Sequence, residues 1–123
     1  MKANRFYLTT FKNFSERFVI NTQDLKHSDS LSSIGELDKD ARYYLSETGK
    51  SGFGITSDGT LIALHSTDKS GRAAIKAAMK LGAYKLDCFA GYLSELYAKF
   101  GFEVVRREPN WTPGGPDVVW MER

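Results

Sequence analysis

The sequence predicts a single α+β domain built on a central, mostly antiparallel β-sheet flanked by helices. Two observations support this fold class. Asp58-Gly59 lies between two apolar-rich runs, and an Asp-Gly pair in that setting is a strong signal for a β-hairpin. After the hairpin, segments with helical spacing of apolar residues alternate with short strand-like runs. The second half of the chain therefore reads β-β-α-β-α-β-β.

Size and composition are those of an ordinary folded protein. At 123 residues, 41% hydrophobic and 26% charged, the chain is long enough for one core. A net charge of +2 is too small to favour a nucleic acid or membrane partner. The one cysteine, Cys88, and the two histidines, His27 and His65, predict neither an internal disulfide nor a metal centre. With no signal-like or membrane-length apolar run, we expect a cytoplasmic protein.

The first fifty residues give weaker signals. Residues 5–11 have strand composition, and residues 15–21 are either a second strand paired with them or a short helix. The serine-rich residues 22–33 predict a loop. A helix ending at Gly49 is predicted by apolar residues at helical spacing, namely Ile34, Leu37, Ala41, Tyr44 and Leu45.

The second half is easier to divide. We expect strands over 52–57 and 60–67, then a helix over 70–81 with Ser70 as its N-cap. A strand over 84–89 should lie parallel to the strand over 60–67, with a right-handed crossover. The next helix has apolar residues at i, i+3, i+4 and i+7 and ends at a glycine. These residues are Leu93, Leu96, Tyr97, Phe100 and Gly101. Two last strands over 102–107 and 117–121 flank a loop at 111–116.

The turn before the helix over 70–81 has the properties of an anion site. Unpaired N–H groups and the positive end of the helix dipole face whatever lies beyond a helix start. Gly71 allows close approach to the backbone, and Arg72 adds a full positive charge. A pyrophosphate group suits such a site. The alternative is that Gly71 only eases a turn from strand to helix.

Arg72, Lys76 and Lys80 form a basic row, because residues four apart lie on the same face of a helix. Such a row either contacts phosphates of a cofactor or nucleic acid, or is simply a solvated face. Arg72 is the favoured functional member because it lies nearest the helix start.

Three side chains are candidates for proton chemistry. Tyr97 is either a core aromatic or a general acid. Asp87 is either a candidate base or a solvated residue at a strand end. His65 alternates with the apolar Leu64, and a lone histidine in that setting is more often a hydrogen-bonded structural residue.

Two motifs resemble those of the Gcn5-related N-acetyltransferases (GNAT superfamily). The family's cofactor motif, Gln/Arg-x-x-Gly-x-Gly/Ala, reads D-K-S-G-R-A over residues 68–73, so Gly71 and Ala73 match but Asp68 does not. The family's L-Y-x-K-x-G-F signature is matched in full over residues 96–102. The asparagine usual seven residues before the tyrosine is replaced by Ala90. The resemblance covers about residues 50–123. The sequence is also similar to small phage-type members of the family.

The resemblance implies a GNAT-like acyltransferase fold with acetyl-CoA as co-substrate and an unidentified amine as acceptor. Tyr97 would protonate the departing thiolate after direct attack by the amine. The implied cofactor-binding residues are Leu64, His65, Lys69, Ser70, Gly71, Arg72 and Ala73. A non-catalytic binding module of the same fold is the alternative, favoured by Asp68 and Ala90. A nucleic-acid-binding protein is the least favoured interpretation, and a homodimer stays open.

Overall fold

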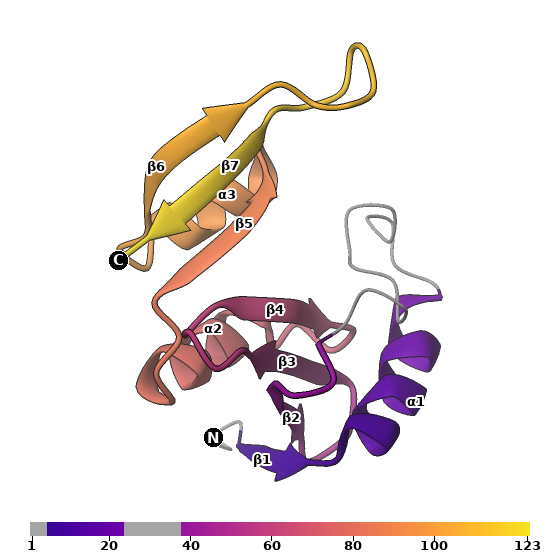
Figure 1. Ribbon diagram of the computed structural model, residues 1–123. Coiled ribbons are helices and arrows are strands. Elements are labelled where there is room, and N and C mark those ends of the chain that lie inside the picture. Colours follow the sequence, from indigo (N-terminus) through magenta and orange to yellow (C-terminus); the bar gives the residue numbers. More distant parts are fainter. Residues whose placement is uncertain (1–4, 24–37) are drawn as a thin grey trace. The chain divides into compact units, whose positions relative to one another are not determined.

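The computed structural model describes residues 5–23 and 38–123 and divides the chain into two compact units (Figure 1). A single domain over the whole chain stays a prediction. The first unit, Met1–Ala83, contains β1 (Phe6–Thr9), α1 (Phe11–Thr22), β2 (Arg42–Ser46), β3 (Ser51–Ile55), β4 (Leu61–Ser66) and α2 (Gly71–Lys80). The second, Tyr84–Arg123, contains β5 (Lys85–Phe89), α3 (Tyr92–Ala98), β6 (Glu103–Glu108) and β7 (Val118–Glu122).

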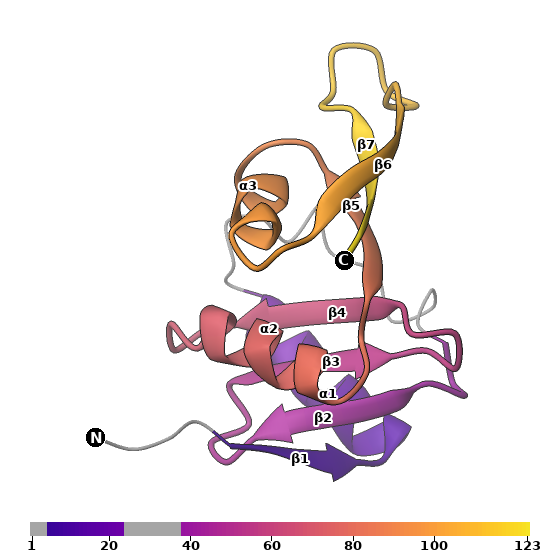
Figure 2. The ribbon, with the colours of Figure 1, turned by 90° about the vertical axis from the view of Figure 1, so that its left-hand side faces the viewer.

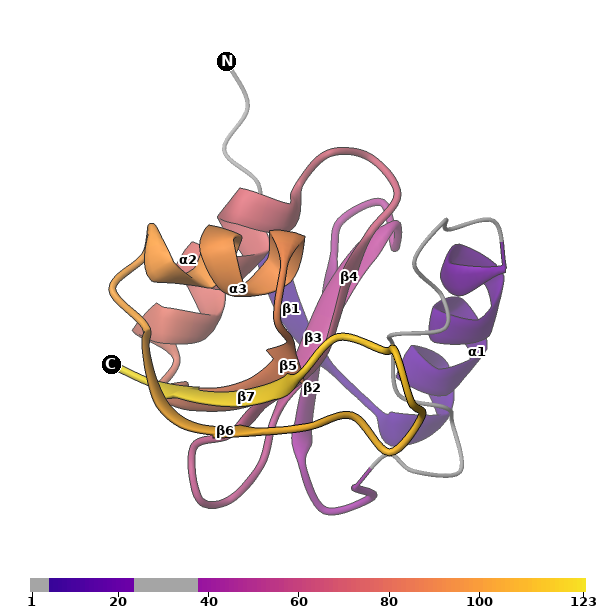
Figure 3. The ribbon, with the colours of Figure 1, turned by 90° about the horizontal axis from the view of Figure 1, so that it is seen from above.

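The first unit is a four-stranded antiparallel sheet in the order β1-β2-β3-β4, with α1 on one face and α2 on the other (Figure 3). On the α1 face, Phe14 and Phe18 pack against Tyr43. Two glycines of β3 permit this close packing. A Cβ at Gly52 would lie 2.9 Å from the Phe14 ring, and one at Gly54 would lie 2.6 Å from the Tyr43 ring.

Residues 11–22 form helix α1, which settles the alternative left open for residues 15–21 in favour of the helix. The Thr10 side chain caps the helix by accepting a hydrogen bond of 3.1 Å from the Asn13 N–H group. Phe14 and Phe18, one turn apart, provide the buried face. The predicted loop over 22–33 lies almost entirely outside the described residues.

The predicted helix ending at Gly49 is wrong where the structure describes it, because residues 42–46 form strand β2. Its other part, up to residue 37, lies outside the described residues. Tyr43, Tyr44 and Leu45 are consecutive and all buried, as expected of an inner strand covered on both faces. Pairing with β1 and β3 therefore outweighs the helix-like spacing.

The β3–β4 hairpin is confirmed, but its turn has three residues rather than two. The Thr56 N–H group donates to the Thr60 carbonyl at 2.9 Å, and the Gly59 N–H group donates to the Thr56 carbonyl at 3.0 Å. Gly59 has a φ of 87°, whereas Asp58 has an ordinary negative φ. This is the pattern of a type I turn followed by a left-handed glycine.

The second unit is a three-stranded antiparallel sheet in the order β5-β7-β6, with α3 packed on one face (Figure 2). The predicted end of α3 is confirmed: Gly101 has a φ of 97°, and the Phe102 N–H group donates to the Tyr97 carbonyl. The strands over 60–67 and 84–89 were predicted to be parallel neighbours, and they are not hydrogen-bonded to each other. Among the described residues, β4 pairs with β3 and β5 pairs with β7. The α+β class with antiparallel sheets is confirmed.

Within residues 5–23 and 38–123, no helix has the length and apolar character needed to cross a bilayer.

Candidate functional site

The start of α2 is open to a ligand. The first backbone hydrogen bond of the helix runs from the Ala74 N–H group to the Ser70 carbonyl at 2.9 Å. The N–H groups of Gly71, Arg72 and Ala73 therefore have no partner within the helix. A Cβ built on Gly71 meets no heavy atom within 4 Å, so there is open space beside the backbone at this residue. This arrangement fits a phosphate group, because N–H groups and the helix dipole both favour an anion.

The carboxylate of Asp68 fixes the loop before α2 through hydrogen bonds. It accepts hydrogen bonds from Ser51 Oγ at 2.6 Å, Ser66 Oγ at 3.1 Å and Thr48 Oγ1 at 3.3 Å. The Ser66 hydroxyl also accepts the Ser70 N–H group at 2.8 Å. Lys69, between them, has a φ of 64°, an unusual conformation for a side-chain-bearing residue. Asp68 thus fixes the turn, a role that the sequence did not indicate.

Ser70 is the N-cap residue, as predicted, but its side chain does not cap the helix. Its hydroxyl instead helps to lower the pKa of the Asp68 carboxyl. Partial burial alone would raise the pKa of the Asp68 carboxyl, but hydrogen bonds from four hydroxyl groups outweigh burial and lower the pKa to about 2. Asp68 is therefore a carboxylate at every physiological pH.

We expect Asp68 to make the protein sensitive to acid. Because its pKa is lower in the folded state, its contribution is complete above the ordinary value near 3.8 and is lost as the pH falls towards about 2. For a carboxylate largely in contact with solvent, screening limits that contribution to about 1 kcal/mol. Asp68→Asn should be less stable than the parent at pH 7 and should lose less stability between pH 4 and pH 2. Thermal unfolding of both proteins between pH 2 and pH 7 measures this difference in stability.

Ser51→Ala is the companion variant, because it removes the shortest of the hydrogen bonds and leaves the carboxylate in place. It should show a smaller acid-dependent loss than the parent. Parallel stability curves for the parent and Asp68→Asn would contradict the assigned role.

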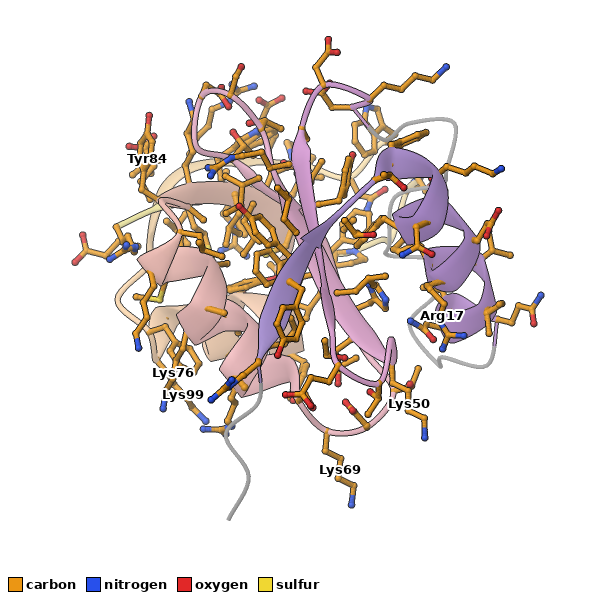
Figure 4. The ribbon with its side chains drawn as sticks, turned by 90° about the horizontal axis from the view of Figure 1, so that it is seen from below. Arg17, Lys50, Lys69, Lys76, Tyr84 and Lys99 are labelled. Atoms are coloured by element: carbon orange, nitrogen blue, oxygen red, sulfur yellow. The ribbon has the colours of Figure 1, made fainter. Side chains whose placement is uncertain are left out.

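The basic row lies on the solvent side of α2. Arg72, Lys76 and Lys80 are all exposed. Figure 4 shows Lys76 on the α2 side of the sheet and Lys69 at the loop, both extending outward. Arg106 pairs with Glu108 and Arg107 with Asp117, and within residues 5–23 and 38–123 no ion pair involves this row. The charges are thus free to meet phosphate, and Arg72 is the nearest to the open N–H groups.

Of the two predicted cofactor residues on β4, Leu64 is half-buried and His65 is 4% exposed. The His65 ring lies against Phe14 and Phe18 of α1, with ring centroids 5.7 and 5.0 Å away. Its side chain therefore belongs to the core of the α1 face and leaves only the backbone of His65 for a ligand. Ala63, two residues before His65, has a φ of 54° at a bulge in β4. The sequence did not indicate this bulge.

Tyr97 and Asp87 belong to the second unit. The Tyr97 ring is 6% exposed and meets Phe102 edge-on at 5.8 Å. Burial, with smaller effects of Cys88 and Asp87, raises the pKa of its hydroxyl well above the ordinary value of 10. The hydroxyl is therefore protonated at neutral pH. Asp87 is exposed on β5, opposite Trp120 of β7.

Comparison with known proteins gives structural matches only. Neither a protein-family model nor a curated protein sequence matches the chain. Its structure is similar to yncA from Salmonella typhimurium, assigned as an acetyltransferase and solved with acetyl-CoA, at a TM-score of 0.62 and 12% identity over 99% of this chain and 94% of that one.

Two further structures show the same similarity. A Bacillus subtilis acetyltransferase in complex with CoA has a TM-score of 0.55 and 17% identity, over 96% of each chain. A protein from Chromobacterium violaceum assigned to the acetyltransferases of the GNAT family has a TM-score of 0.56 and 11% identity, over 100% of this chain and 83% of that one. The chain thus has the α+β fold of the GNAT acetyltransferases, as the sequence motifs indicated.

Proposed function

We propose that this protein is an acetyl-CoA-dependent N-acetyltransferase that moves an acetyl group to an amine by direct attack on the thioester. The observation that carries the proposal is the start of α2, where three N–H groups lack helical partners and the space beside Gly71 is open. Solved proteins of the same fold hold acetyl-CoA or CoA, which supports the same ligand class here.

The residues of the loop and helix start would bind the pyrophosphate of CoA. Within residues 69–73, the Ser70 N–H group already donates to Ser66 Oγ, and the other N–H groups would supply donors that carry no net charge. Arg72 would supply a full positive charge. The backbone of β4 before the loop supplies further hydrogen-bonding groups, because β4 is an edge strand of its four-stranded sheet. Leu64 and the backbone of His65 lie on that strand and would line the arm of the ligand.

Tyr97 is the proposed proton donor to the departing thiolate. Its neutral hydroxyl meets the first requirement of that role, which is to carry a proton at the working pH. Asp87 is the proposed residue that accepts a proton from the attacking amine, since it is an exposed carboxylate on the strand before α3. The acceptor amine itself stays open.

A non-catalytic binding module of the same fold is the second candidate, and Asp68 is the observation that favours it. A permanent negative charge beside the helix start opposes a phosphate, and the two would repel by about 0.5–2 kcal/mol at separations near 8 Å under partial solvent screening. Nucleic acid binding through the basic row of α2 ranks lowest, because a net charge of +2 gives little long-range attraction.

Thermal unfolding with and without acetyl-CoA tests ligand binding directly. A ligand at 100 times its Kd adds about 2.7 kcal/mol to the stability of the folded state, which is a readily measured rise in Tm. Acetyl-CoA should therefore raise the Tm, and adenosine, which lacks the pyrophosphate, should not at the same concentration. No rise at millimolar acetyl-CoA would contradict both the enzyme and the CoA-binding module.

A further inference from the structure

Strand β4 contains a bulge that divides it into two parts. Gly52 pairs with His65 and Gly54 pairs with Ile62, so residues 63–64 both lie opposite the single residue between the two glycines. An extra residue of this kind reverses the alternation of faces along a strand. Ile62 and His65, three residues apart, therefore both face α1.

The bulge also decides what faces α2. On the side of the sheet opposite His65, the Ser66 hydroxyl contacts Ser51 Oγ at 2.9 Å and accepts the Ser70 N–H group. With normal alternation, Leu64 and Ser66 lie on the same face. Had β4 continued without a bulge, the faces after Ile62 would be exchanged, and Ser66 would point away from the loop that it holds.

His65 bonds directly to the bulge. Its Nδ1 lies 3.0 Å from the carbonyl oxygen of Ala63, and its Nε2 lies 3.0 Å from Asn21 Nδ2. The amide nitrogen of Asn21 can only donate, so Nε2 must accept and the ring proton is on Nδ1. The second amide proton of Asn21 goes to the Gly49 carbonyl at 2.7 Å. Asn21 Oδ1 accepts from Arg17 Nη2 at 3.4 Å, so every polar side-chain atom of the pair is used, in one tautomer of the neutral ring.

The surroundings keep the ring neutral. Burial lowers the pKa of His65, the positive charge of Arg17 on α1 adds to this effect, and the bond to Ala63 opposes it. Figure 4 shows Arg17 on the α1 side of the sheet, where its Nε donates to the Gly49 carbonyl at 3.1 Å. Protonation at Nε2 would place two donors against each other at the contact with Asn21.

We propose that His65 is a positioning residue of the cofactor site: its bond to Ala63, completed by Asn21, fixes the bulge that turns Leu64 and Ser66 towards the α2 loop. The side chain itself does not touch the ligand. This inference rests on the proposed binding of CoA at residues 69–73, and it explains why a buried histidine lies next to an alanine with a positive φ.

Three substitutions separate positioning from general stability. Asn in place of His65 can donate to the Ala63 carbonyl as Nδ1 does, Gln can only reach the contact with Asn21, and Leu can make neither bond. We expect His65→Asn to bind CoA within about threefold of the parent, and His65→Gln and His65→Leu to bind at least tenfold more weakly. Titration calorimetry with CoA, below the Tm of each variant, measures the Kd.

Ile55→Val is the matched control, because it loosens the core of the same sheet outside the polar network. It should lower the Tm and leave the Kd unchanged. Folded His65→Gln or His65→Leu with the Kd of the parent would overturn the inference, and so would a Kd that follows the loss of Tm in all four variants. If His65→Leu does not fold, His65→Gln decides.

The amide resonance of Leu64 gives a readout that does not need CoA. It should move in His65→Gln and stay near the parent position in His65→Asn. If the parent binds no CoA, the proposed function fails, while this resonance still reports whether His65 holds the bulge. An unmoved Leu64 amide in His65→Gln would overturn the role of His65 even if CoA binds.

Discussion

Replacing Gly71 by valine is expected to abolish CoA binding while the protein stays folded. A Cβ at this position meets no protein atom within 4 Å, so the side chain has room in the folded chain. Valine is no worse than glycine as a helix residue, and stability should change by less than about 0.5 kcal/mol. The same free space is where a phosphate would approach the N–H groups, and the branched side chain would fill it.

The Kd of CoA should rise more than 100-fold, a loss of more than about 2.7 kcal/mol of binding free energy. Gly71→Ala should lie between the parent and the valine variant, because one methyl group blocks the approach only in part. Ala77→Val, farther along α2, is the control for a branched residue in the same helix and should bind CoA normally. An unchanged CoA affinity in Gly71→Val would show that the phosphates do not lie on the start of α2.

Replacing Tyr97 by phenylalanine should lower the turnover number about 100-fold. General acids contribute about 10²–10⁴-fold to rate. We expect the lower end, because the pKa of the buried hydroxyl is raised far above the value of about 8.5 that is ordinary for a thiol, which weakens it as an acid. The Kd of acetyl-CoA should change little, because the donor acts mainly in the transition state.

The alternative role for Tyr97 is that of a core aromatic, and the phenylalanine variant separates the two. It keeps the ring that is 6% exposed and its edge contact with Phe102, so the Tm should stay near that of the parent. Tyr97→Ala, which removes the ring, should cost about 3–5 kcal/mol of stability. Full turnover in Tyr97→Phe would exclude the hydroxyl as the proton donor. If a broad screen of amines finds no acceptor, the binding module replaces the enzyme.

Much of the fold follows from local chemistry and was therefore predictable. The Asp58-Gly59 pair marked a hairpin because glycine takes a positive φ at little cost, and Gly101 marked the end of α3 for the same reason. The open start of α2 was predictable because every helix begins with unpaired N–H groups and Gly71 adds no side chain there. These features depend on residues close together in the chain.

The failed predictions concern pairings between distant segments. Residues 42–46 have apolar side chains at spacings that suit a helix, yet they form β2 because strands on both sides offer hydrogen bonds and a buried place for Tyr43 and Tyr44. The pairing of β5 with β7 rather than β4 is likewise a choice between partners, which a local pattern does not encode.

The sequence by itself thus determined the α+β class, the ends of α2 and α3, and the glycine at the start of α2 on which the proposed anion site rests. Only the tertiary structure decided the bulge at Ala63, the hydrogen bonds from hydroxyl groups to Asp68 and the buried contact of His65 with Asn21. The physical reason is the distance along the chain: Ser51 lies 17 residues from Asp68, and Asn21 lies 44 residues from His65. Such partners meet only when the whole sheet and α1 have packed, so the spacing of residues within a short segment cannot predict these contacts.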